Sequence, residues 1–178
     1  DVFDLINNNE QHKMLMMLEI KTPCDSEVRK RYRVQEVIST LHDSIQASSL
    51  AKYCIAHSFD HEALKIIEKV NETYVTNNSR PEKRVETLYL QNFYFNYPCS
   101  SVESMQTVQG SGCHAQIHSL TPEIVEKMHR SGKIVAVWID TTAPKELYEE
   151  NEAFYKNIYD LGVDMLTTDH PTRANEIL

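Results

Sequence analysis

The sequence is poor in the residues and runs that mark several large classes of protein. Only 4 of its 178 residues are glycine and 6 are proline, which excludes collagen and most low-complexity chains. No uninterrupted apolar run is long enough to cross a bilayer, so we expect no transmembrane span. Positive charge is scarce too, because 18 Lys and Arg against 26 Asp and Glu give a net charge of −8. Since an acidic chain repels phosphate backbones, we expect no nucleic acid partner.

Several cofactor and catalytic motifs are also absent. The four cysteines form no CxxC pair, so free buried thiols are favoured over a zinc site or a disulfide framework. The glycines never make the GxGxxG pattern of dinucleotide-binding folds, and the GxSxG elbow of α/β-hydrolases does not occur. Two glycosylation sequons, at Asn71 and Asn77, lie in a polar stretch. Sequons often arise by chance, so they do not predict the compartment.

What the chain does have is a regular alternation of strand-like and helix-like segments. Strands are predicted at 14–21, 52–59, 85–95, 113–118, 133–140 and 163–169. Helices are predicted at 26–46, 61–70, 98–109, 122–131, 144–161 and 171–178, and a polar loop at 71–84. Six strand-then-helix units without hairpin signals indicate an α/β fold with a parallel sheet.

The length of the chain favours part of a barrel. A full barrel of eight units takes about 250 residues, or roughly 31 per unit, so six units need about 190. An open doubly wound sheet also fits the length, but the missing glycine fingerprint makes that alternative less favoured.

Helix ends are marked by Asp60 and Thr121 as N-caps, by Pro122 at a first helical position, and by Gly132 and Gly162 as stops.

The first predicted strand carries its charges at its carboxyl end. Because side chains alternate along a strand, Glu19 and Lys21 share one face, and the opposite face is wholly apolar. Ligands bind at the carboxyl ends of strands in α/β proteins. A carboxylate there suits a hard cation such as Mg²⁺ or Ca²⁺, and Lys21 can neutralise a phosphate. A salt-bridged strand end without a ligand explains the pattern equally well.

Two later strands end in polar or aromatic side chains. Trp138 shares a face with Asp140 near the end of the strand at 133–140, where it either walls a substrate pocket or fills the core. Asp169 ends the strand at 163–169, and we favour a role in capping the following turn over a role in binding.

The eight histidines form no recognisable zinc site. His114 and His118 alternate on one face of a short strand, but a third ligand at a typical spacing is missing. We therefore expect hydrogen-bonded rings in the core or at strand ends, including His57 and His61. Surface positions are predicted for the remaining histidines His12, His42, His129 and His170.

A series of short motifs resembles, in its order, the glycerophosphodiester phosphodiesterases. The motifs are Leu18-Glu19-Ile20-Lys21, Ser58-Phe59-Asp60-His61-Glu62, Leu120-Thr121-Pro122-Glu123 through to Val137-Trp138, and Gly162-Val163-Asp164 with Thr168-Asp169-His170-Pro171. The resemblance begins near Met14 and is strongest from Leu120 to Pro171. It implies an eight-stranded TIM barrel that hydrolyses glycerophosphodiesters to an alcohol and glycerol 3-phosphate in lipid metabolism. It further implies that Glu19 is a ligand of a divalent cation, that Lys21 faces the substrate phosphate, and that Trp138 lines the pocket.

The chain departs from the family where the catalytic groups are expected. The family's early His-Arg-Gly, Glu-Asn, Glu-x-Asp and His-Asp motifs are not found ahead of the strand at 14–21, so we predict no catalytic residue in this chain. Both acid–base histidines and two of three cation ligands are expected upstream of Asp1. We therefore expect residues 1–178 to be a partial domain with strands three to eight of the barrel, lacking the N-terminal one or two units and inactive alone.

Two other function classes stay open. One is a phosphoinositide-type phospholipase, although the long basic and aromatic loops that would favour it are not found. The other is a catalytically dead barrel remnant that binds phosphate or serves as a structural module.

Overall fold

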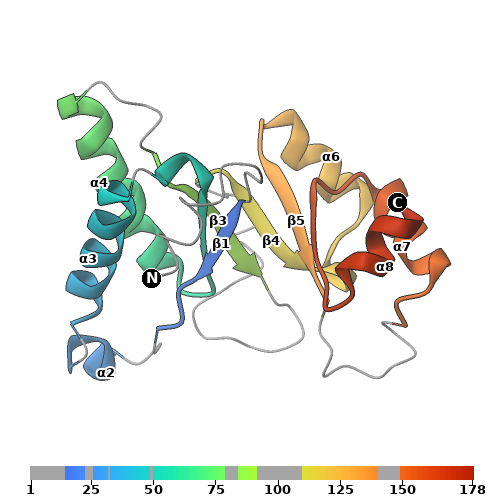
Figure 1. Cartoon of the computed structure of the whole chain (residues 1–178), viewed down its shortest axis with the longest axis horizontal. Helices are drawn as coiled ribbons and strands as arrows, with labels where there is room; N and C mark the ends of the chain where they lie inside the picture. The colour runs from blue at the N-terminus through green and yellow to red at the C-terminus, as the bar shows by residue number, and fades with distance from the viewer. Residues whose placement is uncertain are drawn as a thin grey trace.

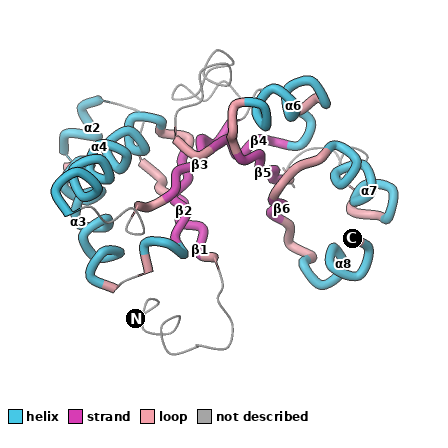
Figure 2. Tube along the Cα trace, turned by 90° about the horizontal axis from the view of Figure 1, so that it is seen from above, coloured by secondary structure: helices cyan, strands magenta, loops and turns pink. Residues whose placement is uncertain are grey.

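The computed structural model describes residues 15–22, 26–31, 33–48, 50–78, 84–91, 110–139 and 149–178. Six strands form one sheet in their sequence order, and every neighbouring pair is parallel. They are β1 (Met16–Glu19), β2 (Cys54–Ser58), β3 (Glu86–Gln91), β4 (Gly112–Gln116), β5 (Ile134–Trp138) and β6 (Met165–Thr167). The sheet curls into an arc, so that it forms part of a barrel wall (Figure 2).

The helices cover the convex side of this arc (Figure 2). They are α2 (Ser26–Arg31), α3 (Val34–Ala47), α4 (His61–Asn78), α6 (Pro122–Arg130), α7 (Glu152–Leu161) and α8 (Pro171–Ile177). Helices α2 to α4 stand at one end of the molecule and α6 to α8 at the other, with the strands between them (Figure 1). The predicted parallel α/β fold is confirmed as a curled six-stranded half-barrel. Among the described residues the sheet does not close, because β1 and β6 pair only with β2 and β5.

Side chains of β1 alternate between the two faces of the sheet, as its sequence predicts. Met16, Leu18 and Ile20 pack outward against the core beneath α3 and α4. Met17 packs on the concave face, in an apolar layer that it shares with side chains of four other strands. The layer consists of Met17, Ile55, Leu88, Ile134, Ala136 and Met165. Glu19, two residues after Met17, therefore continues the concave face at the carboxyl end of the strand.

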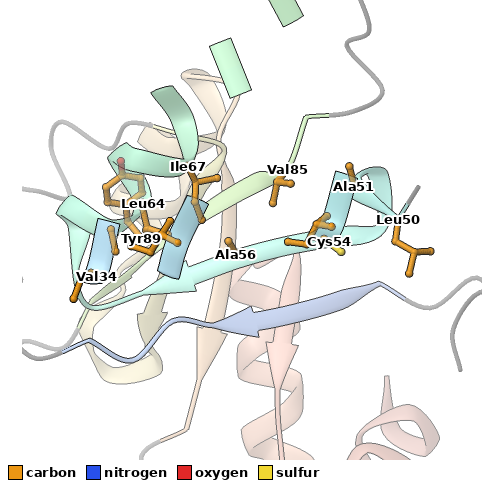
Figure 3. Close-up of a cluster of buried hydrophobic side chains, with 12 residues drawn as sticks. Val34, Leu50, Ala51, Cys54, Ala56, Leu64, Ile67, Val85 and Tyr89 are labelled. Atoms are coloured by element: carbon orange, nitrogen blue, oxygen red, sulfur yellow. The ribbon is translucent and has the colours of Figure 1, made fainter. Parts of the chain in front are cut away.

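Two separate cores hold the helices to the sheet. One joins α3 and α4 to β1, β2 and β3 (Figure 3), with Ile38 and Leu64 at most 1% exposed. The other joins α6 and α7 to β4, β5 and β6. Complete burial of one such aliphatic side chain contributes about 1.5–3 kcal/mol. The strands are thus fixed from their convex side.

Several predicted boundaries are wrong, for local reasons. The helix predicted at 26–46 is broken at Arg33, whose left-handed backbone (φ 50°) separates α2 from α3. The polar stretch after residue 70 continues α4 to residue 78. Helix α7 begins at Glu152 rather than near residue 144, because the side chain of Asn151 accepts from the Phe154 amide 2.9 Å away. The strand predicted at 113–118 ends at residue 116, where a turn of 3₁₀ helix follows. The helix predicted at 98–109 and Asp140 lie outside the described residues.

The predicted caps are confirmed. Asp60 Oδ1 accepts from the Ala63 amide at 3.3 Å, and Thr121 accepts from the Ile124 amide with Pro122 at the first helical position. Gly132 and Gly162 follow helices α6 and α7 with φ of 67° and 78°. That left-handed backbone suits glycine, which has no Cβ to clash.

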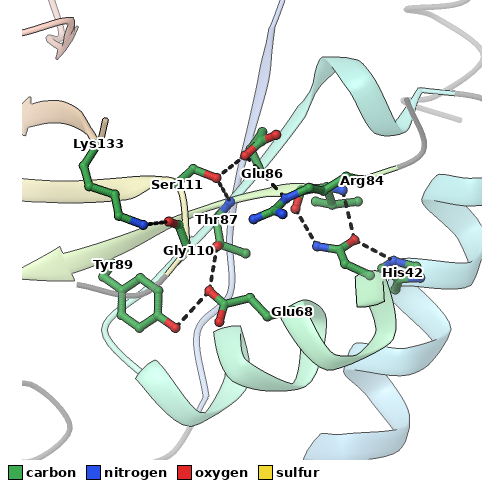
Figure 4. A network of polar contacts seen from close by, with 11 residues as sticks. His42, Glu68, Arg84, Glu86, Thr87, Tyr89, Gly110, Ser111 and Lys133 are labelled. Carbon is green, nitrogen blue, oxygen red and sulfur yellow. Dashed lines mark hydrogen bonds and ion pairs between the residues drawn. The ribbon is translucent and has the colours of Figure 1, made fainter. Parts of the chain in front are cut away.

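A buried amide ties α4 to the start of β3 (Figure 4). Asn71 Nδ2 donates to the Val85 carbonyl at 2.8 Å, and Asn71 Oδ1 accepts from the Val85 amide at 3.0 Å. The same oxygen lies 3.2 Å from His42 Nε2. Asn71 is 3% and His42 1% exposed, so the predicted surface position of His42 is wrong. A side chain buried in this way is also inaccessible to glycosylation at the Asn71 sequon.

The described cysteines are buried free thiols, as expected. Burial raises the pKa of Cys54 to about 11 and that of Cys113 to about 12. Cys24 and Cys99 lie outside the described residues. Within the described part of the chain, no helix has the length and apolar character that a membrane crossing requires.

We predict that Asn71→Ala lowers the free energy of unfolding by about 2–3 kcal/mol, because it leaves the buried amide and carbonyl of Val85 without their hydrogen-bond partner. Urea unfolding followed by circular dichroism measures this loss. Glu72→Ala, at the adjacent exposed position of α4, is the control and should change stability by less than about 0.5 kcal/mol. Equal losses in the two variants would contradict the proposed clamp.

Candidate functional site

Glu19 and Lys21 stand together at the carboxyl end of β1. Lys21 Nζ lies 3.4 Å from Glu19 Oε2, and the side chains are 80% and 35% exposed. An exposed ion pair contributes little to stability, since water screens it. Both charges therefore remain available to a ligand at this edge of the sheet.

The segment that carries these charges is tied to the start of α4. Ser58 Oγ donates to the Ile20 carbonyl at 2.5 Å and accepts from the Asp60 amide at 3.0 Å. The Ile20 amide in turn donates to the His57 carbonyl at 2.8 Å. The hydroxyl of Thr22 donates to the Asp60 carboxylate. The Ser58 and Asp60 side chains thus hold the chain on both sides of Lys21, which gives these motif residues a positioning role.

Two aromatic rings meet at the same edge of the sheet. The Phe59 and Trp138 rings are 5.9 Å apart between centroids and nearly perpendicular, at 86°. They follow β2 and end β5, which are separated in the sheet by β3 and β4. Trp138 Nε1 is buried and finds no hydrogen-bond acceptor among the described residues. The half-buried indole thus leaves its buried N–H without a hydrogen bond among the described residues.

A polar chain lies on the concave face next to these groups. His57 Nδ1 is 3.0 Å from His114 Nδ1, and His114 Nε2 is 3.2 Å from Thr167 Oγ1. The three residues come from β2, β4 and β6, which is the alternate-strand pattern of layers inside a TIM barrel. Hydrogen-bonded histidines were expected, but not this pairing. Side-chain alternation along each strand was a sequence signal that could have assigned both rings to the concave face. Only the register of the sheet brings the two rings together.

Burial keeps both rings neutral. Burial, with a smaller contribution from the neighbouring His57 ring, lowers the pKa of His114 to about 4. Burial is also the main cause that lowers the pKa of His57, where Glu19 opposes the shift and Lys21 adds to it. His61 has a lowered pKa for the same main reason, and its Nε2 lies 3.0 Å from the Leu90 carbonyl. His118, by contrast, is exposed on a 3₁₀ turn and does not pair with His114.

A buried carboxylate that sequence reasoning missed holds the turn after β6. Glu150, 9% exposed, accepts from the hydroxyls of Tyr155 and Thr168. Thr168 Oγ1 accepts from the His170 amide at 2.9 Å. The hydroxyl of Thr168 therefore caps this turn. Exposed Asp169 makes no capping hydrogen bond to the described residues, so the capping role predicted for it is wrong. No sequence spacing distinguishes Glu150 from the neighbouring surface acids.

The described residues fit a divalent cation only in part. Glu19 supplies a carboxylate oxygen, the ligand type that Mg²⁺ and Ca²⁺ prefer. Among the described residues, no group of three His, Cys, Asp or Glu side chains is placed to hold a metal ion. Glu19 therefore suits one position of a shared site rather than a complete site.

A curled parallel sheet with outer helices, and with charged and aromatic side chains at its carboxyl edge, is the arrangement of α/β-barrel proteins, a class whose ligands bind at that edge. The chain belongs to the glycerophosphoryl diester phosphodiesterase family, whose model matches residues 1–173. A search of the curated proteins found no match to this chain.

Solved structures support the same fold. A protein of Silicibacter pomeroyi assigned as a glycerophosphoryl diester phosphodiesterase has a TM-score of 0.74 at 20% identity, over 99% of this chain and 54% of its own. A glycerophosphodiester phosphodiesterase from Parabacteroides distasonis has a TM-score of 0.65 at 17% identity, over 99% and 62%. A protein of Galdieria sulphuraria with the same assignment has a TM-score of 0.60 at 22% identity, over 98% and 62%. This chain thus spans less than two thirds of their length.

We predict that stability falls as the pH drops below about 6.5, because the unfolded chain protonates histidines whose pKa is lowered in the fold. The contribution of His114 to the free energy of unfolding is complete above pH 6.5. It is lost progressively down to about pH 4, with a slope of at most ~1.4 kcal/mol per pH unit. Urea unfolding between pH 7 and pH 4 measures this slope. His114→Gln should flatten it, whereas the matched change of exposed His118 to Gln should not. An unchanged slope in the His114 variant would refute this account.

Proposed function

We propose that this chain contributes to a phosphoric diester hydrolase that cleaves glycerophosphodiesters into an alcohol and glycerol 3-phosphate, in lipid metabolism. The observation that carries the proposal is the placement of Glu19 and Lys21 at the carboxyl edge of a half-barrel in a chain of this family. That edge is where barrel enzymes bind their substrates.

In this proposal the exposed Lys21 ammonium binds and orients the substrate phosphate, and Glu19 is one ligand of a divalent cation, Mg²⁺ or Ca²⁺. The cation, when bound, supplies positive charge that stabilises negative charge on the phosphoryl oxygens. Trp138 lines the substrate site, with its ring held by the edge of Phe59. The acid–base histidines are expected upstream of Asp1, and the described histidines are not assigned to that role.

We further propose that the 178-residue chain is inactive alone. One carboxylate holds a hydrated cation poorly, and within the described residues Glu19 has no companion ligands. The purified chain should release no glycerol 3-phosphate from glycerophosphocholine with Mg²⁺ or Ca²⁺. Clear release would overturn this part of the proposal. Sequencing the transcript upstream of the Asp1 codon is the complementary test, because the proposal requires further histidines and carboxylates there.

We predict that Lys21→Ala weakens the binding of glycerol 3-phosphate by about 10- to 100-fold, because it removes a charge-assisted contact to phosphate. Titration calorimetry on this chain, and on a longer native chain where one is encoded, measures the loss. Lys52→Ala is the control, since this exposed lysine precedes β2 and lies at the opposite end of the strands. Equal affinity of the Lys21 variant and the unmodified chain would refute the phosphate site.

We predict that Glu19→Gln removes most of the stimulation of ligand binding by Mg²⁺ or Ca²⁺, because a neutral amide is a poorer cation ligand than a carboxylate. The measurement is the affinity for glycerol 3-phosphate with and without the cation, on the longer native chain that the proposal requires to supply the remaining ligands. Glu27→Gln, on exposed α2, serves as the matched control. A cation effect that survives Glu19→Gln would place the cation elsewhere.

A second candidate is the catalytically dead phosphate-binding or structural module. This candidate is favoured because the described residues supply only one carboxylate, that of Glu19, to the candidate cation site. Binding of glycerol 3-phosphate without activity in any longer native chain would support this candidate over the hydrolase.

A further inference from the structure

The hydrogen bond between His57 and His114 couples the tautomers of the two rings. Their Nδ1 atoms are 3.0 Å apart, so one Nδ1 must carry the proton and the other must accept it. If His57 Nδ1 accepts, then His57 Nε2 carries a proton and is a donor. If His57 Nδ1 donates, then its Nε2 is an unprotonated acceptor. The partner ring thus decides which chemistry His57 offers to its surroundings.

Thr167, which is exposed at the end of β6, stands at the other end of this chain and takes part in the choice. Its hydroxyl lies 3.2 Å from His114 Nε2 and can either donate or accept. When it donates, His114 carries its proton on Nδ1 and donates to His57. The backbone of Val137 also contacts the His114 ring and raises its pKa, against the larger effect of burial. Two consistent arrangements of the chain therefore exist, and they differ only in the positions of protons.

The outer end of the chain lies next to the proposed phosphate site. No described residue forms a hydrogen bond with His57 Nε2. His57 is the register partner of Glu19 in the parallel pair of β1 and β2. Glu19 and Lys21 are also the charged groups that act on the His57 ring. An anion bound at Lys21 would therefore find an imidazole nitrogen with an unused bonding position nearby.

Building on the function proposed above, we propose that His57 is a further substrate-binding residue whose Nε2–H donates to a phosphate oxygen, and that His114 and Thr167 are positioning residues that set its tautomer. With the ligand bound, the Thr167 hydroxyl donates to His114 Nε2, and His114 Nδ1–H donates to His57 Nδ1. A phosphate anion selects this arrangement because the alternative would point a lone pair at its oxygen. Two neutral rings also avoid the cost of burying a positive charge.

The test compares Thr167→Val, which removes the hydroxyl at nearly constant shape, with Thr167→Ser, which keeps it. The probe is glycerol 3-phosphate with Mg²⁺. Its binding is measured by calorimetry, and its effect on the histidine rings is measured by long-range proton–nitrogen NMR. The His57 signals are identified by their loss in His57→Asn. We expect the ligand to shift a protonated His57 Nε2 signal in the unmodified chain. Thr167→Val should weaken binding about fivefold to tenfold and raise the share of His57 rings that carry the proton on Nδ1 rather than Nε2, because no hydroxyl then donates to His114 Nε2 and keeps the His114 proton on Nδ1. Thr167→Ser should retain both the affinity and the tautomer.

The outcomes separate this inference from the function on which it rests. If Lys21→Ala weakens binding while the His57 nitrogen signals ignore the ligand and Thr167→Val binds normally, the role of His57 is overturned and the phosphate site stands. If neither Lys21→Ala nor Thr167→Val changes the affinity, both proposals fail. If Thr167→Val and Thr167→Ser weaken binding equally with an unchanged His57 tautomer, Thr167 acts only through packing and the positioning chain is refuted.

Discussion

Parallel alignment of six strands brings every strand's carboxyl end to one edge of the sheet, and the candidate site depends on that alignment. The register sets Glu19 beside His57, Gln116 beside Trp138, and Trp138 beside Thr167. The sheet is curled (Figure 2). The ring that ends β5 lies against the ring that follows β2. Residues far apart in the sequence thus meet without any long loop among the described residues reaching across the site.

The concave face combines an apolar layer with a polar chain at the site. Polar groups on such a face are costly unless they are hydrogen-bonded, and a charged one is more costly still. His57 and His114 satisfy this condition as neutral rings bonded to each other and to Thr167. The charges of Glu19 and Lys21 stand beyond them, where water can reach both side chains. The polarity of the inner face therefore increases toward the edge where a phosphate ligand would bind.

The loops at this edge are held by side chains that do not themselves face a ligand. Ser58 and Asp60 fix the segment that follows β1, and Glu150 with Thr168 fixes the turn that follows β6. Away from the edge, Asn71 performs a similar task between α4 and β3 (Figure 4). A site made of exposed charges can hold its geometry only because buried hydrogen bonds hold the backbone that carries it.

The sequence by itself determined the alternation of strands and helices, the inward face of β1 and the positions of Glu19, Lys21 and Trp138 at strand ends, because these follow from local periodicity and capping. It also carried the family, through motifs in a fixed order. It did not determine the local break at Arg33. Nor did it determine the burial of His42 and Asn71, the pairing of His57 with His114, or the hydrogen bond from Thr168 to Glu150. These last features depend on contacts between residues 14 to 57 positions apart, which only the register of the sheet and the packing of helices on it bring together.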